Sequence, residues 1–233
     1  MRVFVAGAAG IIGRELVPML VAAGHEVTGT TRSTERARWL VDAGAQPEVV
    51  DAYEADELRD AVVRARPEVV IHQLTDLARG FARPDLAATA RLRSVGTRNL
   101  VDAAIAAEAR RMVAQSGAWL YADGSLPHHE SDSLLNPADR PGNVVIPGIL
   151  ELERLVTGTP GLEGVVLRYG LFYGGDTGTD RDAQRPPRVS VPAAARATVL
   201  AMERGTAGTI YNVVDDDPTV SNVRARAELG WTP

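Results

Sequence analysis

Short apolar runs alternate with longer segments of helical periodicity along most of this 233-residue chain. The short runs are rich in Val and Ile and are bounded by glycine, proline and polar residues, which predicts buried strands. The longer segments have apolar residues every three or four positions, which predicts amphipathic helices. The predicted strands are 2–6, 26–31, 47–52, 67–74, 111–117, 164–170 and 208–214, and the predicted helices are 11–24, 33–44, 55–66, about 86–109, 144–156 and 191–205.

This alternation predicts an α/β fold with a doubly wound parallel sheet of the Rossmann type, because parallel strands need right-handed helical crossovers on both faces. We expect a dinucleotide-binding domain at 1–170. We expect a short C-terminal substrate lobe at 171–233, whose helix (191–205) and last strand (208–214) pack against the core of the first domain. That lobe is small, or the printed sequence lacks part of it. The polar stretches 122–143 and 174–190 interrupt the alternation, and the first is expected to be a surface loop.

The segment GAAGIIG joins the first predicted strand to the first helix and contains Gly7, Gly10 and Gly13. Gly7 permits a tight turn, Gly10 lets the backbone approach a pyrophosphate, and Gly13 lets the helix pack closely on the strand. The helix N-terminus, at Ile11 and Ile12, then offers N–H donors and the positive end of its dipole to the phosphate. We therefore predict a dinucleotide site. The alternative is a structural turn in a fold that has lost its cofactor.

Arg32 occupies the end of the second strand, where NAD sites usually have Asp or Glu. A guanidinium pairs well with a 2′-phosphate, which a carboxylate would repel, so NADP is predicted in preference to NAD, with Ser33 beside it. The alternative for Arg32 is a solvated surface charge. After the third strand, Asp51 and Ala52 are expected near the adenine, although Asp51 can equally cap the next helix. The predicted cofactor residues are completed by Leu74 and Gln115.

The composition limits the available chemistry. All 25 residues counted as Lys or Arg are arginine, which excludes a lysine base, a Schiff base and a lysine phosphate clamp. There is no cysteine, so disulfides and thiolate nucleophiles are excluded. The net charge of −5 gives no general support for nucleic-acid binding. No apolar run is long enough to span a bilayer, and a buried strand directly after Met1 predicts a cytoplasmic protein without a cleaved targeting peptide.

Several motifs occur in an order that resembles a known family. They are GAAGIIG (7–13), VVIHQL (69–74), GTRNLVDAA (96–104), VVLRYGLFYG (165–174) and AARATVLAMERGTAGTIYNVVDD (194–216). Together they resemble the extended short-chain dehydrogenase/reductase superfamily, in its NAD-dependent epimerase/dehydratase branch. The resemblance implies a nicotinamide cofactor, a small-molecule substrate and a possible homodimer to which the helix 144–156 can contribute.

The resemblance also implies a Tyr-x-x-x-Lys pair on the helix after the fifth strand. In the family the tyrosine moves a proton, and the lysine lowers its pKa and holds the nicotinamide ribose. Alignment through Glu153 places Val145 at the tyrosine position and Ile149 at the lysine position. Neither side chain has acid–base chemistry, so we predict that this helix is a scaffold and an interface.

Three polar residues remain as catalytic candidates. Tyr121 lies just past the fifth strand, where its phenol faces the nicotinamide or anchors the loop by its hydroxyl. Ser116 can donate to a substrate carbonyl. His128 can act as a general acid or base, or it is a solvated loop residue. With His129 and Glu130 it forms too small a cluster for a metal site, and no metal is predicted.

These observations leave three functional hypotheses. The first is an NADP-dependent oxidoreductase for a small carbonyl or alcohol, with an atypical proton source. The second is a family member that uses the cofactor as a scaffold for non-redox chemistry, such as dehydration, cyclisation or epimerisation. The third is a non-catalytic NADP sensor or regulator.

Overall fold

The structure is a computed structural model that describes residues 1–75 and 85–233. Its strands are β1 (Arg2–Ala6), β2 (Glu26–Thr31), β3 (Gln46–Val49), β4 (Val69–His72), β5 (Arg111–Gly117), β6 (Glu163–Tyr169), β7 (Leu171–Tyr173), β8 (Arg188–Ser190) and β9 (Thr209–Val213). Its α-helices are α1 (Ile11–Ala22), α2 (Thr34–Asp42), α3 (Ala55–Ala65), α4 (Leu86–Arg91), α5 (Thr97–Ala106), α6 (Val145–Gly158) and α7 (Val191–Arg204). Shorter segments are the π-helical η1 (Leu92–Gly96) and η5 (Ala225–Leu229) and the 3-10 turns η2 (Pro137–Asp139), η3 (Gly175–Thr177) and η4 (Arg181–Ala183).

The main sheet has seven strands in the order β3-β2-β1-β4-β5-β6-β9, and each neighbouring pair is parallel. The strand order reverses between β1 and β4, which is the topological switch point at which doubly wound folds bind their ligands. The fold class predicted from the sequence is therefore confirmed, and the carboxyl edge beside β1 and β4 is the place to look for a site.

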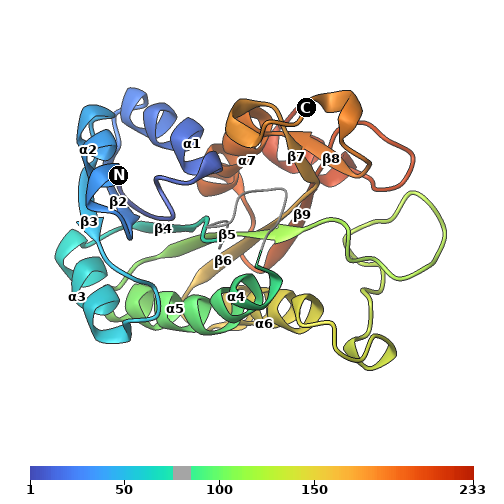
Figure 1. The fold of residues 1–233 in the computed structure, drawn as a ribbon, viewed down its shortest axis with the longest axis horizontal. Coiled ribbons are helices and arrows are strands. Elements are labelled where there is room, and N and C mark those ends of the chain that lie inside the picture. Colours follow the sequence, from blue (N-terminus) through green and yellow to red (C-terminus); the bar gives the residue numbers. More distant parts are fainter. Residues whose placement is uncertain (76–84) are drawn as a thin grey trace.

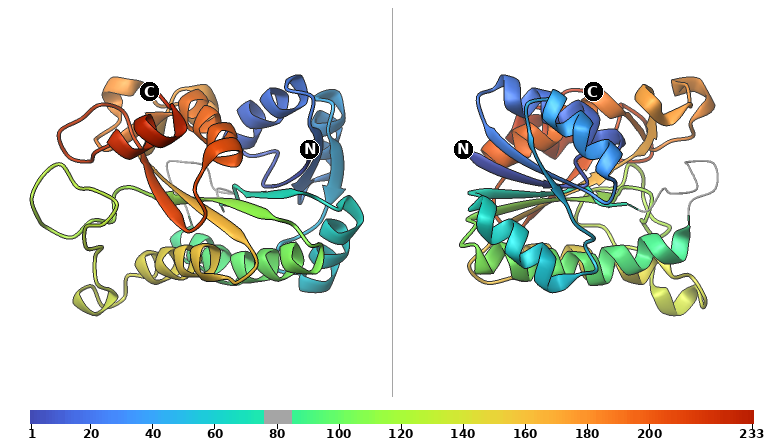
Figure 2. Two further views of the ribbon diagram at one scale, coloured as in Figure 1. Left: turned by 180° about the vertical axis from the view of Figure 1, so that it is seen from behind. Right: turned by 60° about the vertical axis from the view of Figure 1, so that its left-hand side comes forward.

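Helices cover both faces of this sheet (Figures 1 and 2). On one face, α1, α2 and α7 contribute Leu16, Leu40 and Met202 to a buried apolar cluster. On the other face, α3, α5 and α6 contribute a second cluster that includes Leu58 and Leu152. Because the strands are buried from both sides, they read in the sequence as continuous apolar runs.

Two segments differ from the sequence-based prediction. The helix expected at about 86–109 is interrupted by η1, whose π-helical turn divides α4 from α5. The polar stretch 174–190 ends in a strand, β8, which pairs in parallel with β7 in a separate two-stranded sheet. Val189 is the buried residue of that strand, and a single apolar residue gives no readable period.

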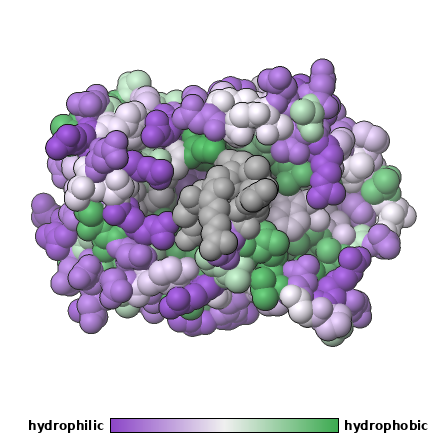
Figure 3. All heavy atoms as spheres, viewed as in Figure 1, coloured by the Kyte–Doolittle hydropathy of each residue, from purple (hydrophilic) through white to green (hydrophobic). Residues whose placement is uncertain are grey.

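Polar side chains cover most of the face seen in Figure 3, with apolar side chains gathered nearer its centre. The stretch 122–143 forms a long loop at one end of the molecule, interrupted by η2 (Figure 1). Among the described residues, no helix has the length and apolar character needed to cross a bilayer.

Candidate cofactor cleft and active site

The glycine loop between β1 and α1 forms the floor of a cleft at the switch point. Gly7 has φ of +86°, a left-handed conformation that favours glycine. A Cβ atom there would lie 2.7 Å from the carbonyl oxygen of Gln73 on the neighbouring strand end. Gly10 is the N-cap of α1 and provides no side-chain cap, so the first N–H groups of the helix remain available to a ligand. Ile11 and Ile12 line the cleft at this point.

Gly13 does not line the cleft. A Cβ atom at this position would collide with the backbone carbonyl of Ala8, so a side chain would push α1 away from the loop. Its role is the close packing of helix and strand that the sequence predicted. Gly7 therefore permits the turn, Gly10 lies where the backbone faces a ligand, and Gly13 permits the close contact between α1 and the loop.

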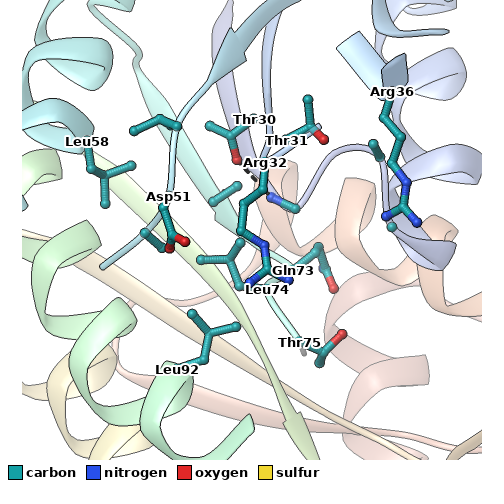
Figure 4. A pocket seen from close by; sticks show the side chains of 16 residues that line it. Thr30, Thr31, Arg32, Arg36, Asp51, Leu58, Gln73, Leu74, Thr75 and Leu92 are labelled. Carbon is teal, nitrogen blue, oxygen red and sulfur yellow. Dashed lines mark hydrogen bonds between the residues drawn. The ribbon is translucent and has the colours of Figure 1, made fainter. Parts of the chain in front are cut away.

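The end of β2 contributes two arginines to the same cleft. Arg32 and Arg36 both line it, together with Thr31 and Ser33. The hydroxyl of Ser33 caps α2 by accepting a hydrogen bond from the backbone N–H of Arg36 at 3.3 Å, which fixes the first helical turn. Figure 4 shows Asp51 and Leu58 on one side of the pocket and Arg36 on the other, with Arg32 between them. Two guanidinium groups at this rim suit a phosphate ester.

Asp51 does not cap α3, whose N-cap is Glu54, but it stabilises the turn before that helix. Its carboxylate accepts a hydrogen bond from the backbone N–H of Tyr53 at 3.0 Å, which stabilises the turn before α3. It also lines the pocket beside Ala52 and the apolar side chains of Leu58 and Leu92. A mixed apolar and carboxylate lining suits a flat heterocycle with an exocyclic amine.

Gln73 connects the two halves of the cleft and lines both. Its amide nitrogen donates to Thr198 Oγ1 at 3.3 Å and to Tyr169 OH at 3.4 Å, while its Oε1 is buried without a hydrogen-bond partner. A buried acceptor without a donor at the floor of a cleft is suited to a ligand that supplies one. Leu74 lies next to it, and Gln115 lines the neighbouring part of the cleft, where its amide donates to the Leu74 carbonyl at 3.1 Å.

Sequence reasoning missed several lining residues. Arg36 had a readable signal, because it follows Arg32 by one helical turn at the start of α2. Phe172, Asp176 and Thr177 had none, since they come from the small C-terminal lobe and reach the cleft only through the fold. The missed lining residues are Ala6, Ala9, Arg14, Thr30, Thr31, Arg36, Val50, Leu58, Gln73, Thr75, Leu92, Phe172, Asp176 and Thr177.

Ser116 and Tyr121, two of the catalytic candidates, belong to a buried polar network beside the cleft. Arg168 binds Glu153 through two hydrogen bonds, Nε–Oε1 at 2.9 Å and Nη2–Oε2 at 2.7 Å. Ser116 donates to Glu153 Oε1 at 2.6 Å. Tyr121 donates to Asn212 Oδ1 at 2.7 Å and accepts from Arg168 Nη1 at 3.0 Å. These hydroxyl groups are therefore committed to protein partners in this structure.

Electrostatics in this network favour a protonated phenol. Burial raises the pKa of Tyr121, and this effect outweighs the opposing influence of Arg168 and Asn212. Burial alone would lower the pKa of Arg168, but the hydrogen bonds and charge of Glu153 outweigh it and raise the pKa. Tyr121 is therefore protonated at neutral pH, and its raised pKa makes the phenol a weaker acid than an exposed tyrosine.

His128, the third candidate, stacks on Tyr121 with ring centroids 4.9 Å apart. Its Nδ1 lies 3.3 Å from the carboxylate of Asp132, and its backbone pairs with Val220 in an isolated bridge. Neither His128 nor Tyr121 lines the described cleft. A catalytic role for these residues and Ser116 stays a prediction. The described residues contain no group of three or more His, Asp or Glu that could hold a metal ion.

The helix α6 has buried apolar side chains at the two positions where the family resemblance predicts the acid–base pair. Val145 and Ile149 are 8% and 0% exposed, and they pack with Leu120 and Ile146 in a small apolar cluster. Four residues after Ile149, Glu153 forms the buried network described above. One side of α6 therefore holds two inert residues followed by a structural carboxylate.

A family model for the "NAD dependent epimerase/dehydratase family" matches residues 3–208. The chain belongs to this family. Its cleft lies at the switch point where the family's fold places a dinucleotide, and its glycine loop, helix terminus and orphaned Gln73 Oε1 fit such a ligand. The chain is an enzyme of the NAD(P)-dependent oxidoreductase or epimerase type, since its named relatives are reductases and epimerases.

Two curated relatives are similar over most of the chain. A Streptomyces protein named 3-diazoavenalumate denitrifying reductase is 41% identical over 242 residues, which cover 94% of this chain and 77% of that protein. A Stigmatella aurantiaca protein named 4-hydroxy-2-methyl-3-oxo-4-farnesyl-3,4-dihydroquinoline-1-oxide ketoreductase is 30% identical, over 94% of this chain and 69% of its own.

Solved structures support the fold. The UDP-glucose 4-epimerase of Thermus thermophilus in complex with NAD is 22% identical with a TM-score of 0.76, over 100% of this chain and 85% of its own. The UDP-glucuronic acid 4-epimerase of Bacillus cereus, in complex with UDP-glucuronic acid and NAD, has a TM-score of 0.78 at 17% identity, over 100% and 94% of the two chains.

Proposed function

We propose that this protein is an NADPH-dependent reductase that acts on a small electrophilic carboxylate without a proton relay on α6. The observation that carries the proposal is the contrast between two parts of one site. The cofactor cleft has its glycine turn, helix terminus and polar lining, whereas alignment through Glu153 predicts the apolar Val145 and Ile149 at the positions of the family's acid–base pair. No lysine exists elsewhere in the chain to replace it.

The preference for NADP over NAD is supported by the end of β2. Arg32 and Arg36 line the cleft next to Thr31 and Ser33, and both hydroxyl and guanidinium groups are good phosphate ligands. No carboxylate occupies the first position after β2, where one would bind the ribose diol and repel a 2′-phosphate. Arg32 and Arg36 would therefore hold the 2′-phosphate, and the glycine loop would hold the pyrophosphate.

When bound, the reduced nicotinamide supplies a hydride. Whether the protein must also supply a proton depends on the group that accepts the hydride. A carbonyl becomes an alcohol only if a proton reaches its oxygen, whereas an aryl diazonium group needs none. In the second case the hydride pair forms the new C–H bond, and the C–N bonding pair leaves with dinitrogen. The apolar α6 helix is suited to an acceptor of the second kind.

The Streptomyces relative supports this choice, because its name describes a denitrifying reductase of a diazo compound that is also a carboxylate. For this chain we infer an aryl diazo carboxylate as the substrate class. The role of the protein is then to hold the acceptor, exclude water and supply no competing nucleophile. The absence of cysteine and lysine fits the last requirement, since both side chains would react with a diazonium group.

Carbonyl reduction is a second candidate, favoured by the Stigmatella ketoreductase and by one observation at the site. The protonated phenol of Tyr121 lies next to the Arg168 cation, with a hydrogen bond of 3.0 Å between them. A guanidinium in that position stabilises the phenolate that would remain after proton donation. This route would require Tyr121 to exchange its partner Asn212 for the substrate.

The test is single-turnover reduction of diazotised 3-aminocinnamate with NADPH that carries deuterium at the transferred position. We expect loss of NADPH absorbance, release of dinitrogen and deuterium on the ring carbon that carried nitrogen. Arg36→Glu is the matched control, since it should abolish NADPH-dependent turnover and leave the fold intact. Turnover of ketone substrates with loss of activity in Tyr121→Phe would instead support carbonyl reduction.

Other outcomes would support the remaining hypotheses. Product formation without net consumption of cofactor would support non-redox chemistry, once a hydride-recycling epimerisation is excluded by the absence of deuterium exchange. Tight NADPH binding without product on either acceptor class would support a sensor.

A further inference from the structure

Arg93 lies in η1. The contacts of one residue before it and one after it show which neighbouring elements its side of the helix faces. Three residues before it, Ala90 packs on α6, since a Cβ atom on Gly148 would lie 2.8 Å from the Ala90 carbonyl oxygen. Four residues after it, Thr97 Oγ1 is hydrogen-bonded to His72 Nε2 at 2.8 Å, at the end of β4. Residues three or four apart share one side of a helix, so Arg93 faces the gap between β4 and α6.

The direction of the side chain follows from helix geometry. Long side chains in a helix lean toward its N-terminus. The helix α4 follows β4 in the chain, so its N-terminus lies at the carboxyl edge of the sheet, where the cleft opens. The charge of Arg93 also acts on His72, whose pKa is lowered to about 3 by burial first and by Arg93 second. The guanidinium is therefore near the end of β4.

Arg93 is half-buried and, unlike the buried Arg168 and Arg111, has no counter-charge among the described residues. Arg168 is bound by Glu153, and Arg111 by Glu163 and two carbonyl oxygens of α7. The Nε of Arg93 is buried without a hydrogen-bond partner, and no ion pair joins its guanidinium to a carboxylate in the described part of the chain. Burial lowers its pKa to about 10, and no acidic group of residues 1–75 and 85–233 opposes that effect. The side chain is still a cation at neutral pH.

A buried guanidinium N–H group without a partner is costly, and such groups are normally hydrogen-bonded or held for a ligand. The anions of the cofactor do not explain it, because the phosphate-binding features lie on the other side of β1, at the glycine loop and the end of β2. The gap beside α6 instead adjoins the cleft at η1, where Leu92, next to Arg93, lines it, and it faces the helix on which the family resemblance predicts the acid–base pair. A π-helical turn, which is often found at functional sites, places Arg93 there.

We propose that Arg93 binds the carboxylate of the substrate and so orients the reacting group toward the nicotinamide. This inference rests on the proposed reductase function for its substrate class, but not for its test. The ligand it requires is a carboxylate on an unsaturated or aromatic frame, because the apolar side chains of Leu74 and Leu92 line the cleft beside η1.

The test is direct binding, measured by calorimetry on the protein saturated with NADP⁺, with cinnamate and cinnamamide as probes. The two probes differ only in the charge of the group that Arg93 would bind. We compare Arg93→Gln and Arg93→Lys with Arg98→Gln, a matched control that loses only an exposed ion pair with Glu151. Thermal unfolding of the ligand-free variants is measured in parallel.

In the wild type, cinnamate should bind more tightly than cinnamamide. Arg93→Gln should weaken cinnamate about tenfold to a hundredfold, the usual loss for a charge-assisted contact, and leave cinnamamide and NADP⁺ unchanged. Arg93→Lys should retain part of the preference, and Arg98→Gln all of it. Ligand-free Arg93→Gln should melt no lower than the wild type, because it removes an unpaired charge.

Equal binding of the two probes to the wild type would overturn the proposal, and so would an equal loss of both probes or of NADP⁺ in Arg93→Gln. A large fall in melting temperature would assign Arg93 a structural role instead. Because none of these measurements needs turnover, failure of hydride transfer with an intact preference for cinnamate would refute the reductase function alone.

Discussion

Replacing Glu153 by glutamine tests whether the buried network holds the walls of the active site together. The carboxylate accepts a hydrogen bond of 2.6 Å from Ser116 and two of 2.7 and 2.9 Å from Arg168. The residues of α6 that precede Glu153 by one and two turns are apolar and buried. Its replacement leaves the Arg168 cation buried without a counter-charge. The loss for one partner of a buried pair is about 3–5 kcal/mol, most of it the cost of the uncompensated charge.

For a chain of this length, that loss corresponds to a fall in melting temperature of roughly 6–20 °C. Glu151→Gln is the matched control, because Glu151 lies two residues earlier on α6 and pairs only with Arg98 and Arg154 at the surface. Exposed pairs of this kind contribute about 0–1 kcal/mol. Urea unfolding followed by tryptophan fluorescence measures both variants under the same conditions.

A double variant separates the charge effect from general disruption of the core. Glu153→Met combined with Arg168→Met removes both charges and keeps apolar volume, so it should be less destabilised than Glu153→Gln alone. If Glu153→Gln lost no more stability than Glu151→Gln, the network would not have the structural role assigned to it. If the double variant had a lower free energy of unfolding than Glu153→Gln, packing and not charge would dominate the stability of this network.

Three further outcomes follow from the structure. Arg32→Ala and Arg36→Ala should each raise the dissociation constant of NADPH about tenfold or more and change that of NADH little; equal losses for both cofactors in a fluorescence titration would contradict the assignment. Gly7→Ala should lose about 1–3 kcal/mol of stability, since its positive φ and the Gln73 carbonyl both oppose a side chain, and circular dichroism melts would measure it. His72 has its pKa lowered to about 3 in the fold, so the stability it contributes is complete above pH 6.5 and is lost as the pH falls from 6.5 toward 3. A His72→Gln variant should therefore lose less melting temperature than the wild type between pH 7 and pH 4. An equal dependence of melting temperature on pH in the two proteins would refute the effect.

Most of the fold could be predicted from the sequence, because its strands are continuous apolar runs and its helices keep a clear period. The cofactor half of the site was predictable for the same reason. Gly7, Gly10 and Arg32 sit at fixed offsets from β1 and β2, so local sequence places them in the cleft without knowledge of the tertiary structure.

The substrate half depends on contacts between distant segments, which carry no local signal. Asp176 and Thr177 reach the cleft from a lobe whose sequence has no period. Tyr121 and Ser116 could be named as candidates, but their hydrogen bonds to Asn212 and Glu153 come from strands and helices that are far apart in the chain. Sequence alone left the loop-anchoring and catalytic alternatives for Tyr121 equally open.

The helix α6 carries a buried anchor, Glu153, and, before it, the two positions at which the family resemblance predicts an acid and a base. Glu153 ties it to β5 and β6, so the helix is retained for stability whether or not it carries an acid and a base. Val145 and Ile149 precede that anchor by eight and four residues and pack in a separate small apolar cluster, so a change there acts on that cluster and leaves the contacts of Glu153 in place. In evolutionary terms, such a helix lets a lineage change these two positions together with their apolar neighbours, while the anchor at Glu153 and the cleft at the glycine loop are kept.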